Sequence, residues 1–201
     1  MFDSVEEFKS IMRANYFPQK TQAWDYCLNA AKIDGMYLEF GVKSGASLFY
    51  FAEKVKPKII YGFDSWQGLP ESWVRSPSKT LRKGKFRRDP PKCPSNVKLV
   101  SGLFAESIPL FCNDYKGITS FVHIDCDLYQ SAKDVLWGIN NRIVPGTVMQ
   151  FDEICDWEEE SYTYWQEHEY KALKEWCIEF KRKVLQLCSN SKTAGAVIVE
   201  S

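Results

Sequence analysis

Hydrophobic and polar positions along the chain follow two periods, one typical of buried strands and the other of helices. A largely apolar run at 36–42 predicts a strand, and it leads into a glycine turn at 43–45. Residues 46–55 have helical spacing and stop before Pro57, and a second strand-like run covers 59–64. This order of strand, turn, helix and strand predicts a βαβ unit, and such units build parallel sheets.

The same alternation continues towards the C-terminus. Strands are expected at 97–100, 120–124 and 147–151, and helices at about 107–111, 131–140 and 165–181. Two final strand-like runs, 184–188 and 196–200, are joined by a short polar link that suits an antiparallel hairpin. The pattern therefore predicts an α/β fold with a doubly wound, Rossmann-like sheet, mostly parallel with one antiparallel C-terminal strand.

The length of 201 residues favours a single domain. Two helical patterns fill residues 1–35, and the Rossmann-like domain is expected over 36–201. Within it, residues at about 72–96 carry four prolines and eight basic residues against one acid. This composition predicts a long inserted loop, either solvated or acting as a lid whose cations attract an anionic ligand.

Composition excludes several classes of partner. The 26 basic and 26 acidic residues balance, which weighs against electrostatic binding to nucleic acid or to an anionic membrane. No apolar run reaches the roughly 18 residues of a membrane span, and the acidic start MFDSVEEFKS does not resemble a secretory signal. The seven cysteines are scattered singly, without a CxxC pair, so we expect reduced thiols in a cytoplasmic protein.

The ends of the first two strands carry residues typical of a nucleoside site, because ligands of open α/β sheets bind beyond the carboxyl ends of strands. The first end carries Glu39, Gly41, Gly45 and Ser47. Glycines allow close backbone approach, and the following helix offers free N–H groups. The second ends at Asp64, about 20 residues further on, where an acid can bond both ribose hydroxyls.

One position narrows the choice of cofactor. Lys43 stands where the dinucleotide fingerprint has its middle glycine, so the loop suits a nucleoside without phosphates, such as S-adenosylmethionine, better than NAD or FAD. Ser65, Trp66 and Gly102 complete the predicted cofactor-binding residues. Trp66 is expected either to stack on adenine or to pack in the core.

Carboxylates end the next two strands, with Asp125 and Asp127 on one and Asp152 and Glu153 on the other. Such acids would meet at one edge of the sheet and repel each other unless a proton or a cation intervened. A hard cation such as Mg²⁺ would relieve the repulsion and leave positions for substrate oxygens. Helix capping and solvated loop acids are the alternative, but four acids at two strand ends favour a site.

Four stretches together resemble the macrocin O-methyltransferase family of class I methyltransferases, which includes sugar O-methyltransferases of antibiotic pathways. They are LEFGV at 38–42 with Gly45 and Ser47, GFDSWQGLPE at 62–71, HIDCDLYQS at 123–131, and Pro145-Gly146 leading to FDE at 151–153. The resemblance implies a seven-stranded sheet, S-adenosylmethionine, and a Mg²⁺ ion that orients two vicinal hydroxyls of a small-molecule acceptor, such as a sugar. It leaves room for a homo-oligomer.

Site roles follow from the resemblance by position. Asp125, Asp152 and Glu153 would bind the metal, although Glu153 departs from the family's second aspartate, and Asp127 would be the general base. Without a metal, Asp125 would hold the cofactor's amino group. His168 is a second candidate base, but its charged helical surroundings favour a surface position, whereas His123 is expected in the core.

Two other functions stay open on the sequence. Asp125-x-Asp127 also resembles the DxD motif of metal-dependent glycosyltransferases that use nucleotide sugars, but that function leaves the 39–47 loop unexplained. The other is a non-catalytic nucleoside-binding module, which would keep cofactor affinity without turnover.

Overall fold

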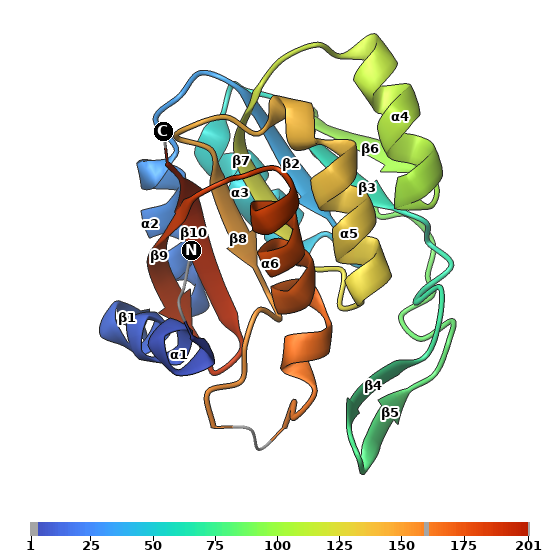
Figure 1. The fold of residues 1–201 in the computed structure, drawn as a ribbon. Coiled ribbons are helices and arrows are strands. Elements are labelled where there is room, and N and C mark those ends of the chain that lie inside the picture. The colour runs from blue at the N-terminus through green and yellow to red at the C-terminus, as the bar shows by residue number, and fades with distance from the viewer. Residues whose placement is uncertain (1–3, 159–160, 201) are drawn as a thin grey trace.

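The computed structural model describes residues 4–158 and 161–200. An eight-stranded sheet runs through the centre in the order β1-β9-β10-β8-β7-β2-β3-β6 (Figure 1). Its strands are β1 (Tyr16–Phe17), β2 (Met36–Phe40), β3 (Ile60–Asp64), β6 (Val97–Ser101), β7 (Thr119–Ile124), β8 (Val148–Phe151), β9 (Val184–Asn190) and β10 (Ala194–Val199). Neighbouring strands are parallel except at β10, which is antiparallel to both β8 and β9. The mostly parallel α/β sheet with an antiparallel C-terminal strand is thus confirmed.

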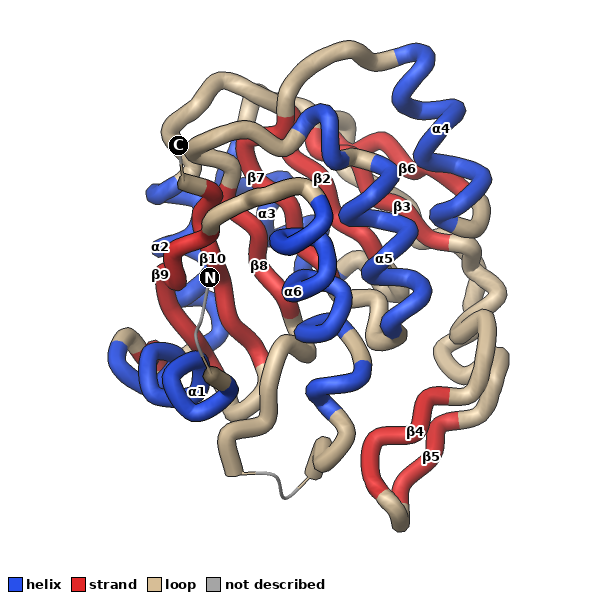
Figure 2. The backbone as a smooth tube through the Cα atoms, in the orientation of Figure 1, coloured by secondary structure: helices blue, strands red, loops and turns tan. Residues whose placement is uncertain are grey.

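Helices cover both faces of this sheet, so that the molecule has three layers (Figure 2). Helices α5 and α6 lie in front of the sheet in Figure 1, with α4 beside them, and α2 and α3 lie behind it. The helices are α1 (Val5–Ala14), α2 (Lys20–Ala30), α3 (Ala46–Val55), α4 (Phe104–Asp114), α5 (Tyr129–Gly138) and α6 (Glu169–Glu179), with short 3₁₀ turns at Asn140–Arg142 and Trp165–Glu167. No helix of this described part is both long and apolar enough to cross a membrane.

Strand β7 shows why the sequence folds this way. All six of its residues are buried, as expected for a central parallel strand covered by helices on both faces. Successive side chains alternate between the faces, so Phe121 joins the core beneath α2 and α3, whereas Val122 joins the core beneath α5 and α6. The buried run ends where the strand ends, and the acids Asp125 and Asp127 follow at the sheet edge.

The sheet has one strand more than the resemblance predicts. Residues Tyr16 and Phe17 pair in parallel with Ser189 and Asn190, which adds β1 beyond β9. The Ser189 N–H also donates to the Asn15 carbonyl, at 3.0 Å. The N-terminal segment is therefore part of the sheet. A strand of two residues is too short to leave a periodic signal in the sequence.

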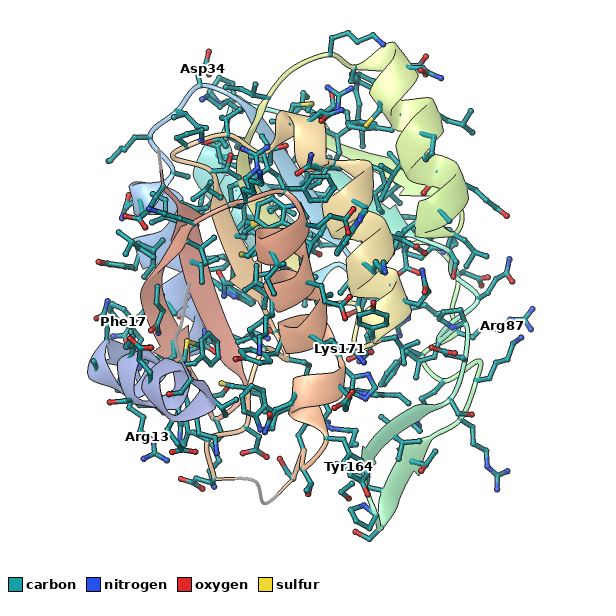
Figure 3. The ribbon with its side chains drawn as sticks, viewed as in Figure 1. Arg13, Phe17, Asp34, Arg87, Tyr164 and Lys171 are labelled. Carbon is teal, nitrogen blue, oxygen red and sulfur yellow. The ribbon has the colours of Figure 1, made fainter. Side chains whose placement is uncertain are left out.

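The expectation of an irregular loop at 72–96 is corrected for its first part. Residues Trp73–Ser76 (β4) and Lys79–Leu81 (β5) form an antiparallel hairpin. Trp73 is buried, and its indole N–H donates to the Tyr162 hydroxyl at 3.2 Å. The Arg87 side chain instead projects from the end of the insert into solvent (Figure 3). The hairpin is thus docked on the segment that precedes α6.

Candidate active site

A cavity of about 480 Å³ lies at the carboxyl ends of the central parallel strands. It is lined by many of the residues that the sequence singled out, namely Gly41, Asp64, Ser65, Gly102, Asp125, Asp127, Asp152 and Glu153. Four others, Glu39, Gly45, Ser47 and Trp66, do not line it. The strand ends therefore bring together the four acids and the start of the glycine loop, at Gly41, as the topology predicts.

Asp64 is fixed at the edge of the cavity by two backbone amides. The Lys43 N–H donates to Oδ2 and the Trp66 N–H donates to Oδ1, each at 2.8 Å. These bonds hold the glycine loop and the loop after β3 around one carboxylate. A carboxylate has about four acceptor positions, so Asp64 keeps the capacity to accept further hydroxyl donors from the cavity.

The glycines of the first loop have a packing reason besides the predicted approach of a ligand. Gly41 has φ +96°, and a Cβ there would lie 1.8 Å from the carbonyl oxygen of Asp125. A Cβ on Gly45, at φ +83°, would lie 2.6 Å from the Phe49 ring. Gly41 is required because the ends of β2 and β7 touch, and Gly45 because the loop folds onto α3.

Glu39 lies beneath the glycine loop and is fully buried. Its Oε2 is 3.0 Å from Nδ1 of His123, and the Ser47 hydroxyl donates to Oε1 at 3.1 Å. Burial raises the pKa of Glu39, against the opposing effect of His123. His123 is buried, as expected, and the carboxylates of Asp152 and Glu39 raise its pKa to about 10 despite burial. Glu39 and Ser47 thus support the loop from below.

The four acids that follow β7 and β8 differ in their partners. The Asp152 Oδ1 is 2.6 Å from the Lys20 ammonium and 3.8 Å from Nε2 of His123. Although burial opposes it, these two groups lower the pKa of Asp152 to about 2. Glu153 pairs with Arg75 at 3.2 Å, yet burial raises the pKa of Glu153 to about 8. Each acid of this pair therefore has a cation of the chain beside it.

The two acids after β7 are less compensated. Burial, with repulsion from Asp152, raises the pKa of Asp127 to about 7 and raises that of Asp125 well above its ordinary value. Asp127 also has φ +64°, in the left-handed region. Backbone strain of this kind collects at functional sites, although aspartate tolerates it better than most residues.

The predicted magnesium site is not formed by this arrangement. Across residues 4–158 and 161–200, no three carboxylate, imidazole or thiol groups converge so that they could hold a metal ion. Two of the three expected ligands instead contact Lys20 and Arg75. The donor set is of the right chemistry for Mg²⁺, but its carboxylates are engaged by the protein's own cations, so the residues present do not fit the ion.

Glu169, in the first turn of α6, is a site residue that sequence reasoning missed. It is fully buried, and its Oε1 accepts the backbone N–H groups of Cys126 and Asp127, each at 3.2 Å. Its Oε2 accepts the Glu153 N–H at 3.1 Å. One carboxylate therefore ties together the two loops that carry the acids. Its position in a charged helical stretch gave no signal of this role.

Glu169→Ala should destabilise the protein by about 2–4 kcal/mol, because it leaves one buried and two part-buried N–H groups without their acceptor. Chemical denaturation measures this change. Glu167→Ala is the matched control, since Glu167 is 65% exposed and pairs with Lys171 in the next turn. That change should stay within about 0.5 kcal/mol. Equal effects of the two substitutions would contradict the role of Glu169.

Two aromatic expectations can be compared with the geometry. Trp66 packs against the core, and its indole N–H donates to the Ser101 hydroxyl at 3.0 Å. Phe104, which the sequence did not single out, lines the cavity and packs edge-on against Phe40. His168 is half-buried beside the rings of Trp73 and Tyr162, outside the cavity lining. Phe104 therefore lines the cavity together with two other aromatic residues, Trp73 and Phe86.

The sheet order and the cavity at its carboxyl edge define a Rossmann-like α/β protein. The family model described as "Methyltransferase domain" matches residues 38–154, which is more than half of the chain. The chain therefore belongs to the methyltransferase domain family. No curated protein sequence matches it significantly.

Solved structures share the fold at low sequence identity. The calicheamicin methyltransferase CalS11 is 20% identical, with a TM-score of 0.65 over 98% of this chain and 94% of its own. The O-methyltransferase NovP is 16% identical, with a TM-score of 0.59 over 90% and 77%. The mycinamycin-pathway methyltransferase MycE, solved with Mg and SAH, is 14% identical, with a TM-score of 0.59 over 90% and 49%.

Proposed function

We propose that this chain transfers the methyl group of S-adenosylmethionine to a hydroxyl group of a small molecule, such as a sugar or a glycosylated metabolite. The observation that carries the proposal is that Asp64 and Asp127 line one cavity, at the ends of β3 and β7. Asp64 is suited to bind a ribose, and Asp127 to accept a proton from an acceptor hydroxyl.

The cofactor half of the cavity is built by three loops. The loop at 41–43 and Asp64 would hold the ribose, and Ser65 and Gly102 would line the nucleoside beside Phe104. This assignment keeps Glu39, Gly45, Ser47 and Trp66 as residues that shape the loops rather than touch the ligand. Their contacts to His123, Phe49 and Ser101 support that role.

Methyl transfer requires little of the protein beyond alignment of the cofactor and the acceptor, because the sulfonium already activates its methyl group. The acceptor oxygen attacks this methyl carbon, the carbon–sulfur bond breaks, and S-adenosylhomocysteine leaves as a neutral thioether. Asp127 takes the hydroxyl proton. Holding the acceptor in line with the methyl group contributes much of the rate enhancement, and Glu169 fixes the Asp127 backbone for this purpose.

The part of the cavity that would bind the acceptor is bordered by the hairpin of β4 and β5. Arg75 lines the cavity, and among the described residues its Nε is buried without a hydrogen-bond partner. A guanidinium in this state suits an acceptor oxygen, and a phosphate or carboxylate in particular. CalS11, whose structure has the same fold, is described as a TDP-rhamnose 3'-O-methyltransferase, which acts on a sugar that carries a diphosphate.

No step of the proposed mechanism passes through a metal ion. The resemblance predicts Mg²⁺, and MycE was solved with it, but here Lys20 and Arg75 engage Asp152 and Glu153. The proposed reaction therefore uses the residues of the chain alone.

Ligand-dependent melting separates this function from its alternatives. We expect S-adenosylhomocysteine to raise the melting temperature, because a ligand at about 100 times its Kd adds about 2.7 kcal/mol of stability. NADH and UDP-glucose, with Mn²⁺ where needed, should leave it unchanged. Stabilisation by UDP-glucose alone would indicate a glycosyltransferase. Binding of S-adenosylhomocysteine without methylation of any nucleotide sugar, glycoside or catechol in mass spectrometry would favour a non-catalytic module.

A further inference from the structure

Lys20 holds an unusual position for a cation. It opens α2, where the helix dipole disfavours positive charge, and the preceding Gln19 gives no side-chain cap. Its ammonium nevertheless lies 2.6 Å from Oδ1 of Asp152 and 5.1 Å from the centre of the Trp24 ring. The local helix therefore does not explain this lysine, whereas the acids at the sheet edge do.

The acids that Lys20 faces are the three that were expected to bind a metal. Lys20 contacts Asp152 directly, and Asp125 and Glu153 line the same cavity as Asp152, so that all three carboxylates attract the ammonium. Such long-range attraction falls steeply with distance and is strongest where water is scarce. The ammonium thus sits in the field of the whole acidic cluster, in direct contact with one of its members.

Arg75 reaches the same acidic cluster from another part of the chain. It lies on the β4 strand of the insert. Its Nη2 is 3.2 Å from Oε2 of Glu153, and the two side chains are only 14% and 15% exposed. The guanidinium carbon lies 4.5 Å and 4.8 Å from the ring centres of Trp73 and Tyr162. Arginine stays charged at any ordinary pH, so this contact is a permanent positive charge at the acidic edge.

We propose that Lys20 and Arg75 take the place of a divalent cation in this active site, so that the chain binds its cofactor and transfers methyl groups without a metal ion. The inference rests on the proposed methyltransferase function. Lys20 acts through Asp152 and is a positioning residue, whereas Arg75 lines the cavity and faces the acceptor. A divalent ion that entered here would meet two cations already in contact with two of its ligands.

Binding of Mn²⁺, followed by the electron paramagnetic resonance signal of the free ion, tests the inference without an acceptor. Wild-type protein with S-adenosylhomocysteine should show no binding at millimolar Mn²⁺. Lys20→Met, which keeps the length of the side chain and removes its charge, should bind Mn²⁺ at least about tenfold more tightly. Lys20→Arg keeps the charge and should behave as the wild type.

Lys54→Met is the matched control. Lys54 is 44% exposed and pairs with Asp25 at 2.9 Å, whereas Lys20 is 43% exposed. Loss of the Lys54 charge should leave Mn²⁺ binding unchanged. If wild-type protein binds Mn²⁺ as tightly as Lys20→Met, or if neither binds it, Lys20 does not stand in for the ion and the inference is overturned.

Methyl transfer gives a second readout once an acceptor has been found. EDTA should change the wild-type rate by less than about twofold, and a loss of activity that Mg²⁺ restores would overturn the inference. A different result would contradict the proposed methyltransferase function itself. If S-adenosylhomocysteine does not shift the melting of wild-type protein, the chain does not bind the cofactor, whatever the Mn²⁺ signal shows.

Discussion

Asp64→Ala should remove the thermal stabilisation that S-adenosylhomocysteine gives to this protein. Under the proposed function, the substitution deletes two charge-assisted hydrogen bonds to the ribose, each of about 1.5–3 kcal/mol. It also deletes the acceptor of the Lys43 and Trp66 N–H groups, so both loops around the cofactor lose their anchor. We expect the Kd to rise by about 100-fold or more, which a melting curve at fixed ligand concentration detects.

Asp34→Ala is the control for this change. Asp34 is 96% exposed and pairs with Lys58 on the surface, far from the hairpin in Figure 3. The control should keep the full shift with S-adenosylhomocysteine. Asp64→Asn retains one acceptor oxygen and should fall between the two. A full ligand-induced shift in Asp64→Ala would remove Asp64 from the cofactor site.

Asp127→Asn should lower kcat by about 10²–10⁴ while S-adenosylhomocysteine binding is unchanged. An amide cannot accept the hydroxyl proton, but it has nearly the same shape and leaves the backbone bond to Glu169 in place. Initial rates with tritiated S-adenosylmethionine and an active acceptor measure kcat, and melting curves measure binding of the product.

The control for the base is Asp114→Asn, at the exposed end of α4. It should leave both the rate and the cofactor shift unchanged. An Asp127→Asn enzyme with wild-type kcat would show that another group takes the proton. A parallel loss of cofactor binding would instead mean that Asp127 shapes the loop.

The fold was predictable because its main signals are local. Apolar runs such as 120–124 mark strands buried on both faces, and the residue after each run marks the sheet edge. The acids and the glycine loop could therefore be assigned to one side of the sheet from the sequence. Strand β1 was not predicted, because two residues are too few to show a periodic pattern of apolar positions. Its pairing with β9 also joins opposite ends of the chain.

The partners of the acids could not be predicted in the same way. Repulsion between Asp125, Asp152 and their neighbours predicts that a proton or a cation intervenes, but it does not say which one. Lys20 and Arg75 come from a helix and a hairpin distant in the sequence, and only the tertiary structure brings them to the cluster. Glu169 was missed for the same reason, since its acceptors are used by the backbone of two remote loops.

The contact between Gly41 and Asp125 also bears on inhibitor design. Backbone atoms of the two loops touch, and the Asp125 N–H donates to the Phe40 carbonyl at 2.9 Å. A change of side chain cannot loosen such a contact, so the backbone itself joins the proposed nucleoside subsite beside Gly41 to the acids that begin at Asp125. Under the proposed function, a bisubstrate ligand should bind best with a short linker that is matched to this spacing.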